Sequence, residues 1–179
     1  MALPNEIGVE MKKTNFNFYI TGMGLVNAAM NLSLILSDST IHLDRVLNIG
    51  WAGSFEIPKG ELVEVNEVVH RSLNSFIKSP TLKLDCMSPI KKVICGSADF
   101  VESKNESFFL VKRDKVNFQV MDMELFALAS VCKKKNIKIS SFKYITDQSD
   151  EKLFENLKEN KLLADQKFAD LLLKLQKGF

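Results

Sequence analysis

The chain has 179 residues, a formal net charge of +2, and 46% hydrophobic against 26% charged residues. This composition is that of a globular protein, and it excludes a disordered polyelectrolyte. The net charge is small and Lys and Arg are not concentrated in one part of the chain, so we expect neither nucleic acid nor a membrane surface as a partner. No stretch approaches the ~18 consecutive apolar residues of a membrane span, and the N-terminus lacks the pattern of a secretory signal.

Cysteine and histidine usage predicts a cytoplasmic protein without a metal centre. Cys86, Cys95 and Cys132 are widely spaced and form no CxxC pair, so we expect buried free thiols in a reducing compartment. His42 and His70 have no partner at metal-ligand spacing. We therefore expect no metal and no cofactor.

Short β-rich runs alternate with longer segments of helical period, and no linker or repeat interrupts them. This alternation predicts a single α/β domain over residues 1–179. In chain order, we expect a strand over 16–21, a helix over 26–36, a strand over 45–49, a long strand or bent hairpin over 61–70, a loop with one short strand over 71–90, strands over 92–95 and 118–121, a helix over 123–135, a strand over 137–145, and one or two amphipathic helices over 151–177.

Four segments that follow predicted strands carry glycines or carboxylates, and we expect them to form one site. They are residues 22–24, 50–53, 122–124 and 146–150. In open α/β sheets, ligands bind outside the carboxyl ends of the strands. Glycines let the backbone approach a ligand closely, while methionines supply soft apolar surface, a combination that suits a flat, hydroxylated molecule. Each residue alone also has an ordinary structural role, such as Glu124 at a helix N-terminus.

Taken in order, five motifs resemble one family. They are Thr21-Gly-Met-Gly-Leu-Val-Asn-Ala-Ala29, Val46-Leu-Asn-Ile-Gly-Trp-Ala-Gly-Ser54, Gly60-Glu-Leu-Val63, Met121-Asp-Met-Glu124 and Tyr144-Ile-Thr-Asp147. The series resembles the purine nucleoside phosphorylase superfamily, and within it the 5′-methylthioadenosine/S-adenosylhomocysteine nucleosidases and related hydrolases such as futalosine hydrolase. The resemblance covers roughly residues 2–150. It implies a three-layer α/β/α fold around a central mixed β-sheet, and a homodimer or larger oligomer.

The resemblance also implies roles for individual residues. Glu6, in Ala2-Leu-Pro-Asn-Glu6, corresponds to the carboxylate that positions the attacking water. Asp147 corresponds to the aspartate that protonates the purine. Glu124 would accept hydrogen bonds from the ribose hydroxyls, with Met23 and Met123 against the sugar.

Further residues are implied around the base and the nucleophile. The purine would stack on Phe100 and Val101, whose backbone would read its edge. Trp51, Ala52 and Gly53 would bind the substrate, and Trp51 stands where the family has a small residue that helps to shape the nucleophile pocket. Asp122 has two interpretations, a second ribose-side carboxylate or a helix cap.

The chemistry itself requires such residue types. Cleavage of a purine N-glycosidic bond passes through a ribosyl cation, and the purine leaves well only when N7 is protonated. One carboxylic acid must therefore hold a proton near neutral pH, and burial of Asp147 would favour its protonated form. An ionised Glu6 on the far face of the ribose would activate water, which predicts an inverting displacement.

Besides Trp51, the sequence departs from the pattern of the superfamily in three places. The strand that precedes the catalytic glutamate is absent, because only Met1 precedes Ala2. No arginine stands where a phosphorylase would hold phosphate, which favours water as the nucleophile. Lys143 replaces an arginine, a change that we interpret as structural. The alternatives are a phosphate-dependent purine nucleoside phosphorylase and a nucleoside-binding protein that has lost catalysis, and the base and 5′ substituent stay open.

Overall fold

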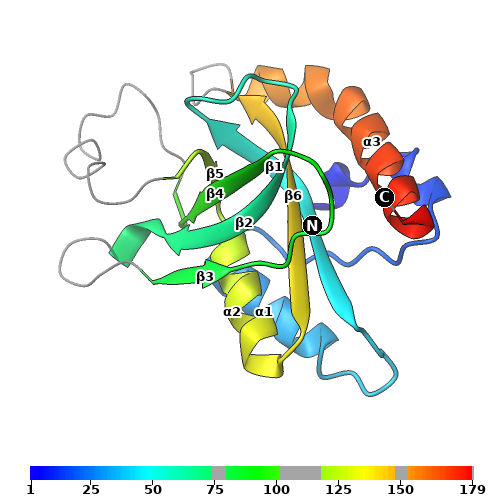
Figure 1. Ribbon diagram of the computed structural model, residues 1–179, viewed down its shortest axis with the longest axis vertical. Coiled ribbons are helices and arrows are strands. Elements are labelled where there is room, and N and C mark those ends of the chain that lie inside the picture. Colours follow the sequence, from blue (N-terminus) through cyan, green and yellow to red (C-terminus); the bar gives the residue numbers. More distant parts are fainter. Residues whose placement is uncertain (74–79, 101–117, 148–152, 179) are drawn as a thin grey trace.

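The computed structural model describes residues 1–73, 80–100, 118–147 and 153–178 (Figure 1). The elements in chain order are η1 (Pro4–Glu6), η2 (Met11–Lys13), α1 (Leu25–Ile35), β1 (Arg45–Ser54), β2 (Leu62–His70), η3 (Arg71–Leu73), β3 (Thr81–Lys83), β4 (Lys92–Ser97), β5 (Val120–Asp122), α2 (Leu125–Lys135), β6 (Lys138–Asp147) and α3 (Leu153–Lys177). Within the described ranges, no helix has the length and apolar character needed to cross a membrane.

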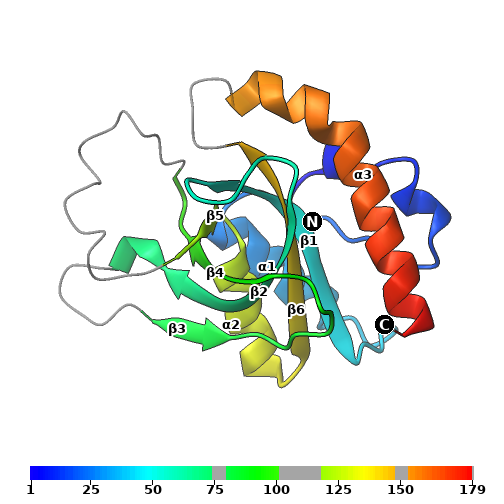
Figure 2. The same ribbon diagram turned by 45° about the horizontal axis from the view of Figure 1, so that its top comes forward.

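The strands form one mixed sheet that curls until it meets itself. Its order is β3-β2-β4-β5-β1-β6, and β2 also pairs antiparallel with β6 through residues 62–65. β1 runs parallel to β6, and β4 runs parallel to both β2 and β5. The second pairing of β2 turns the sheet into a closed ring with β3 on its outside, which Figure 2 shows from a tilted view.

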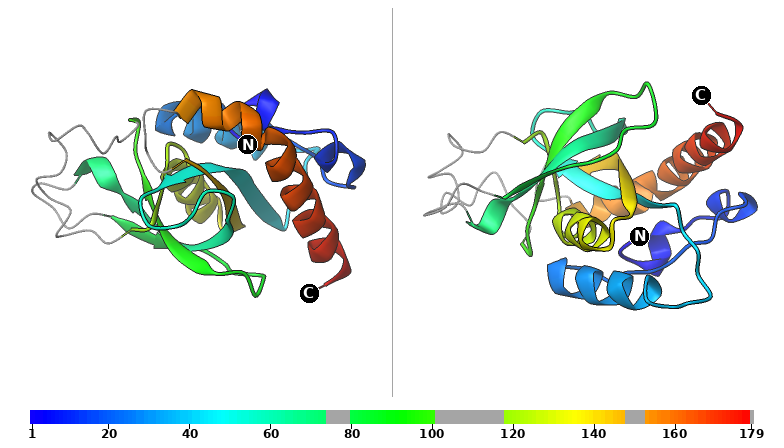
Figure 3. Two further views of the ribbon diagram at one scale, coloured as in Figure 1. Left: turned by 90° about the horizontal axis from the view of Figure 1, so that it is seen from above. Right: turned by 60° about the horizontal axis from the view of Figure 1, so that its bottom comes forward.

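Helices cover this sheet on two sides (Figure 3). α1 and α2 lie side by side and pack on a core that includes Leu32, Leu128 and the buried valines of β2. On the other side, Phe168 and Leu172 of α3 pack against the second core, which includes Phe142 of β6. β6 is buried at every position except Lys138, as expected for a strand with both faces covered. The predicted α/β fold with a mixed central sheet is confirmed.

The segment 16–21 is not a strand, so that prediction is wrong. It lies outside the sheet and bonds instead to the first residues of the chain: the Met1 amino group donates to Tyr19 O at 3.1 Å, and Thr21 N donates to Met1 O at 2.9 Å. Two or three such bonds do not make a ladder, because a strand needs a partner along its length.

Two other predictions are corrected in extent. β1 continues through the glycines to Ser54, because Gly53 pairs with Asp147 of β6 and with Met121 of β5, and Ser54 pairs with Val120. The same pairing with Gly53 extends β6 to Asp147. Of the two alternatives for residues 61–70, the structure has the long strand, Leu62–His70. Cys95 and Cys132 are buried free thiols as expected, but Cys86 is exposed because it lies in the connection between β3 and β4.

Candidate active site

Gly50 of β1 lies beside the charged groups of Lys143 and Glu6, and these three residues form what is called the Gly50 cradle below. A Cβ atom on Gly50 would lie 3.5 Å from Lys143 Nζ and 3.6 Å from Glu6 Oε1. Glu6 reaches this place because η1 folds back on itself, with Leu3 N donating to Glu6 Oε2 at 3.0 Å. A Cβ atom on Gly50 would therefore make ordinary contacts with a buried carboxylate and a buried ammonium group.

Lys143 is held in the cradle by Asp122 at the end of β5. Its Nζ atom lies 2.7 Å from Asp122 Oδ2, and both side chains are almost fully buried. Burial lowers the pKa of Lys143. The negative charges around it, with Asp122 the largest of them, outweigh burial and raise this pKa above its ordinary value. Burial likewise opposes ionisation of Asp122, but the Lys143 ammonium holds the pKa of that carboxyl below its usual range. The pair is therefore charged on both sides at neutral pH.

Glu124 adds a third carboxylate, and its pKa lies well above that of Asp122. It sits at the start of α2, and its Oε1 atom accepts a hydrogen bond of 2.9 Å from Gly24 N. Burial, reinforced by the charge of Asp122, raises the pKa of Glu124 to about 7, although Lys143 and the Gly24 amide act in the opposite direction. The charge of Glu6 also contributes to this rise. A carboxyl group that titrates near neutral pH is a feature of functional sites.

The glycine turn before α1 is fixed by two carboxylates from distant parts of the chain. Glu124 accepts from Gly24 N, and Asp99 Oδ1 accepts from Leu25 N at 2.5 Å. Gly24 has a φ of +88°, which L side chains rarely adopt, so the turn requires glycine here. These bonds hold the N-terminus of α1, with Met23 half exposed beside it, against the carboxylate cluster.

Asp147 lies at the end of β6. The edge of the sheet where Gly53 of β1 pairs with Asp147 of β6 and with Met121 of β5 is called the rim below. Asp147 is opposite Gly53 in the register with β1, it is buried, and its Oδ2 atom accepts a bond of 2.8 Å from Thr146 Oγ1. Gly53 in turn pairs with Met121, which is adjacent to Asp122. The pairing of three strands therefore brings Asp147 to the edge that carries the cluster.

A buried arginine anchors Phe100 at the outer end of the rim. Arg71 donates from Nη2 to Phe100 O at 2.9 Å, and its guanidinium carbon lies 4.6 Å from the centre of the Phe100 ring. The ring of Phe118 lies 5.9 Å away from the same carbon. Gly96 makes room for this stack, since a Cβ there would lie 2.8 Å from Arg71 Cδ.

Comparisons with known proteins agree with this arrangement. No protein-family model matches the chain. A 5′-methylthioadenosine/S-adenosylhomocysteine nucleosidase of Buchnera aphidicola subsp. Acyrthosiphon pisum (strain APS) is 34% identical over 167 residues, covering 78% of this chain and 70% of the relative. The chain belongs to the 5′-methylthioadenosine/S-adenosylhomocysteine nucleosidase family.

Solved structures share the fold of this nucleosidase family member. A futalosine hydrolase mutant of Helicobacter pylori strain 26695 superimposes with a TM-score of 0.77 at 17% identity, covering 97% of this chain and 96% of the other. The Helicobacter pylori 5′-methylthioadenosine/S-adenosylhomocysteine nucleosidase with butyl-thio-DADMe-Immucillin-A gives 0.77 at 18% identity, covering 97% and 95%. At these identities the likeness concerns the fold alone.

The structure brings most of the predicted nucleosidase residues to one rim. Glu6, Asp122 and Glu124 meet around the Gly50 cradle, while Ala52, Gly53, Met123 and Asp147 lie on the adjoining strand ends. Trp51 packs with the apolar cluster under α3. Val101 lies outside the described residues. Asp122 accepts from Leu125 N at 3.0 Å, so it does cap α2 as well as pairing with Lys143.

Three residues of the rim were not predicted as part of the site. Lys143 was interpreted as structural, yet a lysine inside an apolar strand needs a buried acid as its partner, and that signal could have identified it. Asp99 and Arg71 act on residues that are distant along the chain, and no local pattern shows such contacts.

Proposed function

We propose that this chain hydrolyses the N-glycosidic bond of a purine nucleoside of the methylthioadenosine or S-adenosylhomocysteine type and releases the free base. The observation that carries this function is the pair of buried carboxylates Glu6, in η1, and Glu124, at the start of α2, with the pKa of Glu124 at about 7. Membership of the nucleosidase family supports the same reaction. A ribosyl cation is stabilised by fixed negative charge, and this rim supplies it.

Glu6 acts as the base that activates water. Its Oε1 atom lies 3.6 Å from the Cβ position of Gly50 and the Lys143 Nζ atom lies 3.5 Å from it, so a water molecule bound beside Gly50 would contact both charged groups. Removal of a proton by Glu6 generates the nucleophile, which attacks the anomeric carbon from the face opposite the purine. Lys143 does not titrate in this step, because Asp122 keeps it protonated.

Glu124 binds the sugar. An ionised carboxylate accepts hydrogen bonds from both ribose hydroxyls, and its charge becomes more favourable as the ring acquires positive charge. The Gly24 amide orients one oxygen and leaves the other for the ligand. Met23 and Met123, at the two flanking turns, supply apolar surface beside the sugar.

Asp147 protonates the leaving purine at N7. Its side chain is buried, and Thr146 Oγ1 donates to one of its oxygens and so fixes its orientation. Phe100, held by Arg71, provides the ring on which the base stacks. This assignment requires the acid and the base to act from opposite sides of the bond that breaks.

Water is a better nucleophile for this rim than phosphate. Among the described residues, Arg45 donates to Ser140 Oγ at the other end of β1 and Arg71 donates to Phe100 O, so neither guanidinium faces the cradle. Lys143 is already paired with Asp122. A phosphate dianion placed beside Glu6 and Glu124 would meet net negative charge.

The deciding experiment measures release of free base from methylthioadenosine, S-adenosylhomocysteine, adenosine and inosine, with and without phosphate. We expect release that does not depend on phosphate and that Glu6→Gln lowers at least ~100-fold. Strict dependence on phosphate would establish a phosphorylase instead. Ligand binding without release from any substrate would establish a nucleoside-binding protein that has lost catalysis.

We also propose that two copies of the chain associate through α1. Val26, Met30 and Leu34 lie on one side of this helix and are 66%, 60% and 68% exposed, while Ala28 and Leu32 on the other side are buried. A continuous apolar stripe of this kind marks an interaction surface. Sedimentation velocity should show a dimer that Met30→Lys dissociates, whereas Ser33→Lys on the same helix serves as the charge control.

A cytoplasmic location fits the three free cysteines, which suit a reducing compartment. The small net charge gives no reason for nucleic acid or a membrane surface to bind.

A further inference from the structure

Asp99 is an exposed aspartate that bonds to a helix distant in the sequence. Its Oδ1 atom accepts a hydrogen bond of 2.5 Å from the backbone N–H of Leu25, the first residue of α1. The residue before the helix, Gly24, has no side chain that could cap it, and the first turn of α1 contains no acidic residue. The N–H groups at the start of a helix have no partner within the helix and need acceptors from elsewhere. Asp99 supplies one of these acceptors from the segment that follows β4.

The segment that carries Asp99 is fixed independently of α1. On one side of Asp99, Ala98 N donates to Asp122 O of β5 at 3.2 Å. On the other side, Phe100 O accepts a bond of 2.9 Å from Arg71 Nη2. Asp99 thus lies between two residues that are bonded to β5 and to η3, and its bond to α1 ties the helix to this fixed segment.

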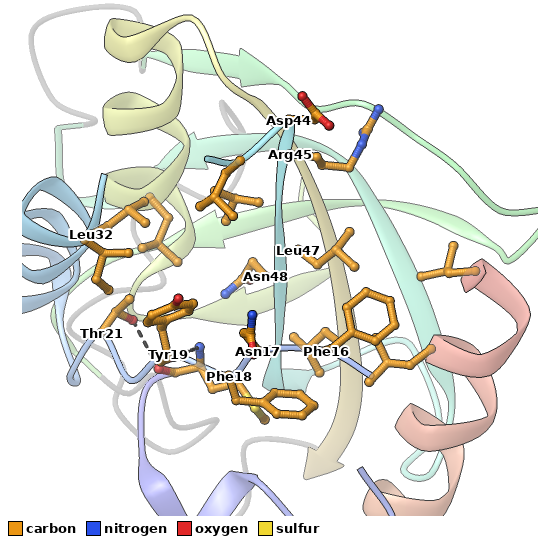
Figure 4. A pocket seen from close by; sticks show the side chains of 18 of the residues that line it. Phe16, Asn17, Phe18, Tyr19, Thr21, Leu32, Asp44, Arg45, Leu47 and Asn48 are labelled. Carbon is orange, nitrogen blue, oxygen red and sulfur yellow. Dashed lines mark hydrogen bonds between the residues drawn. The ribbon is translucent and has the colours of Figure 1, made fainter. Parts of the chain in front are cut away.

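The glycine turn before α1 forms one unit with the helix. Asn27 Nδ2 donates to Met23 O and Asn31 Nδ2 donates to Thr21 O, each at 2.9 Å. Figure 4 shows Thr21 next to α1, where Thr21 and Leu32 both line the neighbouring pocket. Because helix side chains hold the carbonyls of the turn, a shift of the start of α1 would move the turn with it.

The same turn contains the amide that contacts Glu124. Gly24 N donates to Glu124 Oε1 at 2.9 Å, and the next amide along the chain is the one bonded to Asp99. A hydrogen bond to a carboxylate favours its ionised form, so the Gly24 amide lowers the pKa of Glu124 against the rise caused by burial. The other charged groups that face Glu124 are Asp122 of β5, Lys143 of β6, Glu6 of η1 and the Met1 amino group.

We propose that Asp99 is a positioning residue that joins the two halves of the site: by holding the first residue of α1 beside the base-side segment 98–100, it keeps Gly24 N on the sugar-side carboxylate of Glu124. This inference rests on the proposed function, which gives Glu124 to the ribose and Phe100 to the purine. An ordinary helix cap stabilises its helix and nothing more. Asp99 does more than this, because the amide beside its own bond partner orients Glu124.

Three variants of the full chain separate these two roles. Asp99→Ala removes the bond to Leu25 N, whereas Asp99→Asn keeps an oxygen acceptor and removes the negative charge, which also acts on His70. Asp38→Ala is the matched control, because Asp38 is an exposed aspartate that accepts a bond of 2.9 Å from Thr40 N beyond the other end of α1.

Four quantities are measured in the parent and in each variant. Carbon-13 NMR follows the titration of the Glu124 carboxyl in the protein without ligand. Steady-state kinetics give kcat/KM on methylthioadenosine, and calorimetric titration gives the dissociation constant of adenine, which fills the base side only. Thermal unfolding gives the midpoint, which an ordinary cap would change.

In Asp99→Ala, we expect the titration midpoint of Glu124 to rise by at least ~0.5 pH unit, because the bond from Gly24 N is loosened. The value of kcat/KM should fall at least ~10-fold, while adenine binds within about 3-fold of the parent. Asp99→Asn should restore both the midpoint of Glu124 and kcat/KM, and Asp38→Ala should match the parent in both.

An unchanged titration of Glu124 in Asp99→Ala would overturn the proposal. Equal changes in Asp99→Ala and Asp99→Asn would also overturn it, because the charge and not the bond to Leu25 N would then be responsible. Equal losses in Asp99→Ala and Asp38→Ala, or an equal loss of adenine binding, would indicate a general loss of stability. A parent chain that releases no base refutes the proposed function instead, and the titration of Glu124 still decides whether Asp99 acts on that carboxyl.

Discussion

Lys143 Nζ and Asp122 Oδ2 lie 2.7 Å apart in the interior, one on β6 and the other at the end of β5. β1 separates these two strands in the sheet, so the ion pair spans a neighbouring strand at Gly50, whose missing side chain leaves the path open. Asp122 thereby holds the positive charge of Lys143 close to Glu6 and Glu124. A site with several carboxylates needs this compensation, because like charges in a buried place oppose one another.

The first prediction concerns the stability that this pair supplies. Lys143→Met removes the only positive charge that the described structure pairs with Asp122, and Asp122→Asn removes the carboxylate that pairs with Lys143. We therefore expect each substitution to lower the free energy of unfolding by about 3–5 kcal/mol. The double variant should recover much of that loss, since the amide oxygen of the substituted side chain can still accept from Leu125 N. Urea unfolding of the four proteins as a double-mutant cycle measures the coupling. If the double variant loses as much stability as the two single variants together, the proposed coupling between Lys143 and Asp122 is refuted.

The second prediction concerns pH. Because the ordinary pKa of Glu124 is 4.5 and the folded value is about 7, the folded chain binds more protons between these limits than the unfolded chain does. The free energy of unfolding should therefore fall as pH rises from 4.5 to 7, by about 3 kcal/mol from this group. Nucleoside affinity should change in the opposite direction and rise toward pH 8, since the ribose requires the ionised form.

Glu124→Gln tests both halves of that statement. At pH 8 the variant should be more stable than the parent by up to about 3 kcal/mol, and at pH 4 the difference should disappear. Its affinity for a nucleoside inhibitor should be lower and independent of pH. Calorimetric unfolding and binding titrations across this range provide the two curves. A parent whose affinity is flat from pH 6 to 8 would contradict the role given to Glu124.

The third prediction concerns the acid. Asp147→Asn should lower kcat on methylthioadenosine by ~100-fold or more with little change in KM, because the purine then leaves without its proton. A 4-nitrophenyl riboside needs no protonation of its leaving group. We therefore expect the variant to cleave this compound as fast as the parent does. Equal losses on both substrates would indicate a general structural defect.

The fourth prediction concerns the space beside Gly50. A Cβ there meets Lys143 Nζ and Glu6 Oε1 at ordinary contact distances, so Gly50→Ala should leave the thermal midpoint nearly unchanged. The methyl group takes the space proposed for water, and kcat should fall at least ~10-fold. Gly24→Ala is the contrasting variant: with φ at +88° and Asp99 Oδ1 2.9 Å from the new Cβ, it should lose stability first. An unchanged kcat in Gly50→Ala would show that the attacking water does not bind beside Gly50.

The fifth prediction concerns Arg71. Lysine keeps the charge but not the flat guanidinium that stacks on Phe100 and bonds to its carbonyl. Arg71→Lys should raise KM for purine nucleosides several-fold while kcat changes little, because the stacking ring is less well held. Cleavage of the 4-nitrophenyl riboside, which carries no purine, serves as the comparison. A fall in kcat on both substrates would assign Arg71 a purely structural role.

Local patterns in the sequence determined most of the elements and the residue types of the site. The helical spacing after Gly24 predicted α1, the apolar run after Arg45 predicted β1, and the glycines and carboxylates at strand ends indicated one rim. These features depend on residues close together in the chain, where periodicity and turn chemistry are visible. The order of the five motifs along the chain indicated the family to which the chain is similar.

Only the tertiary structure decided which of these residues meet and how they are charged. The second pairing of β2 closes the sheet. In the part of the chain that the structure describes, no strand runs along residues 16–21, and one edge of β1 pairs only at Gly53 and Ser54. Lys143 joins the site because Asp122 lies across Gly50, and the pKa of Glu124 rises because the fold buries it. Burial and the proximity of charges depend on contacts between distant segments, so a linear pattern names the carboxylates but does not set their protonation.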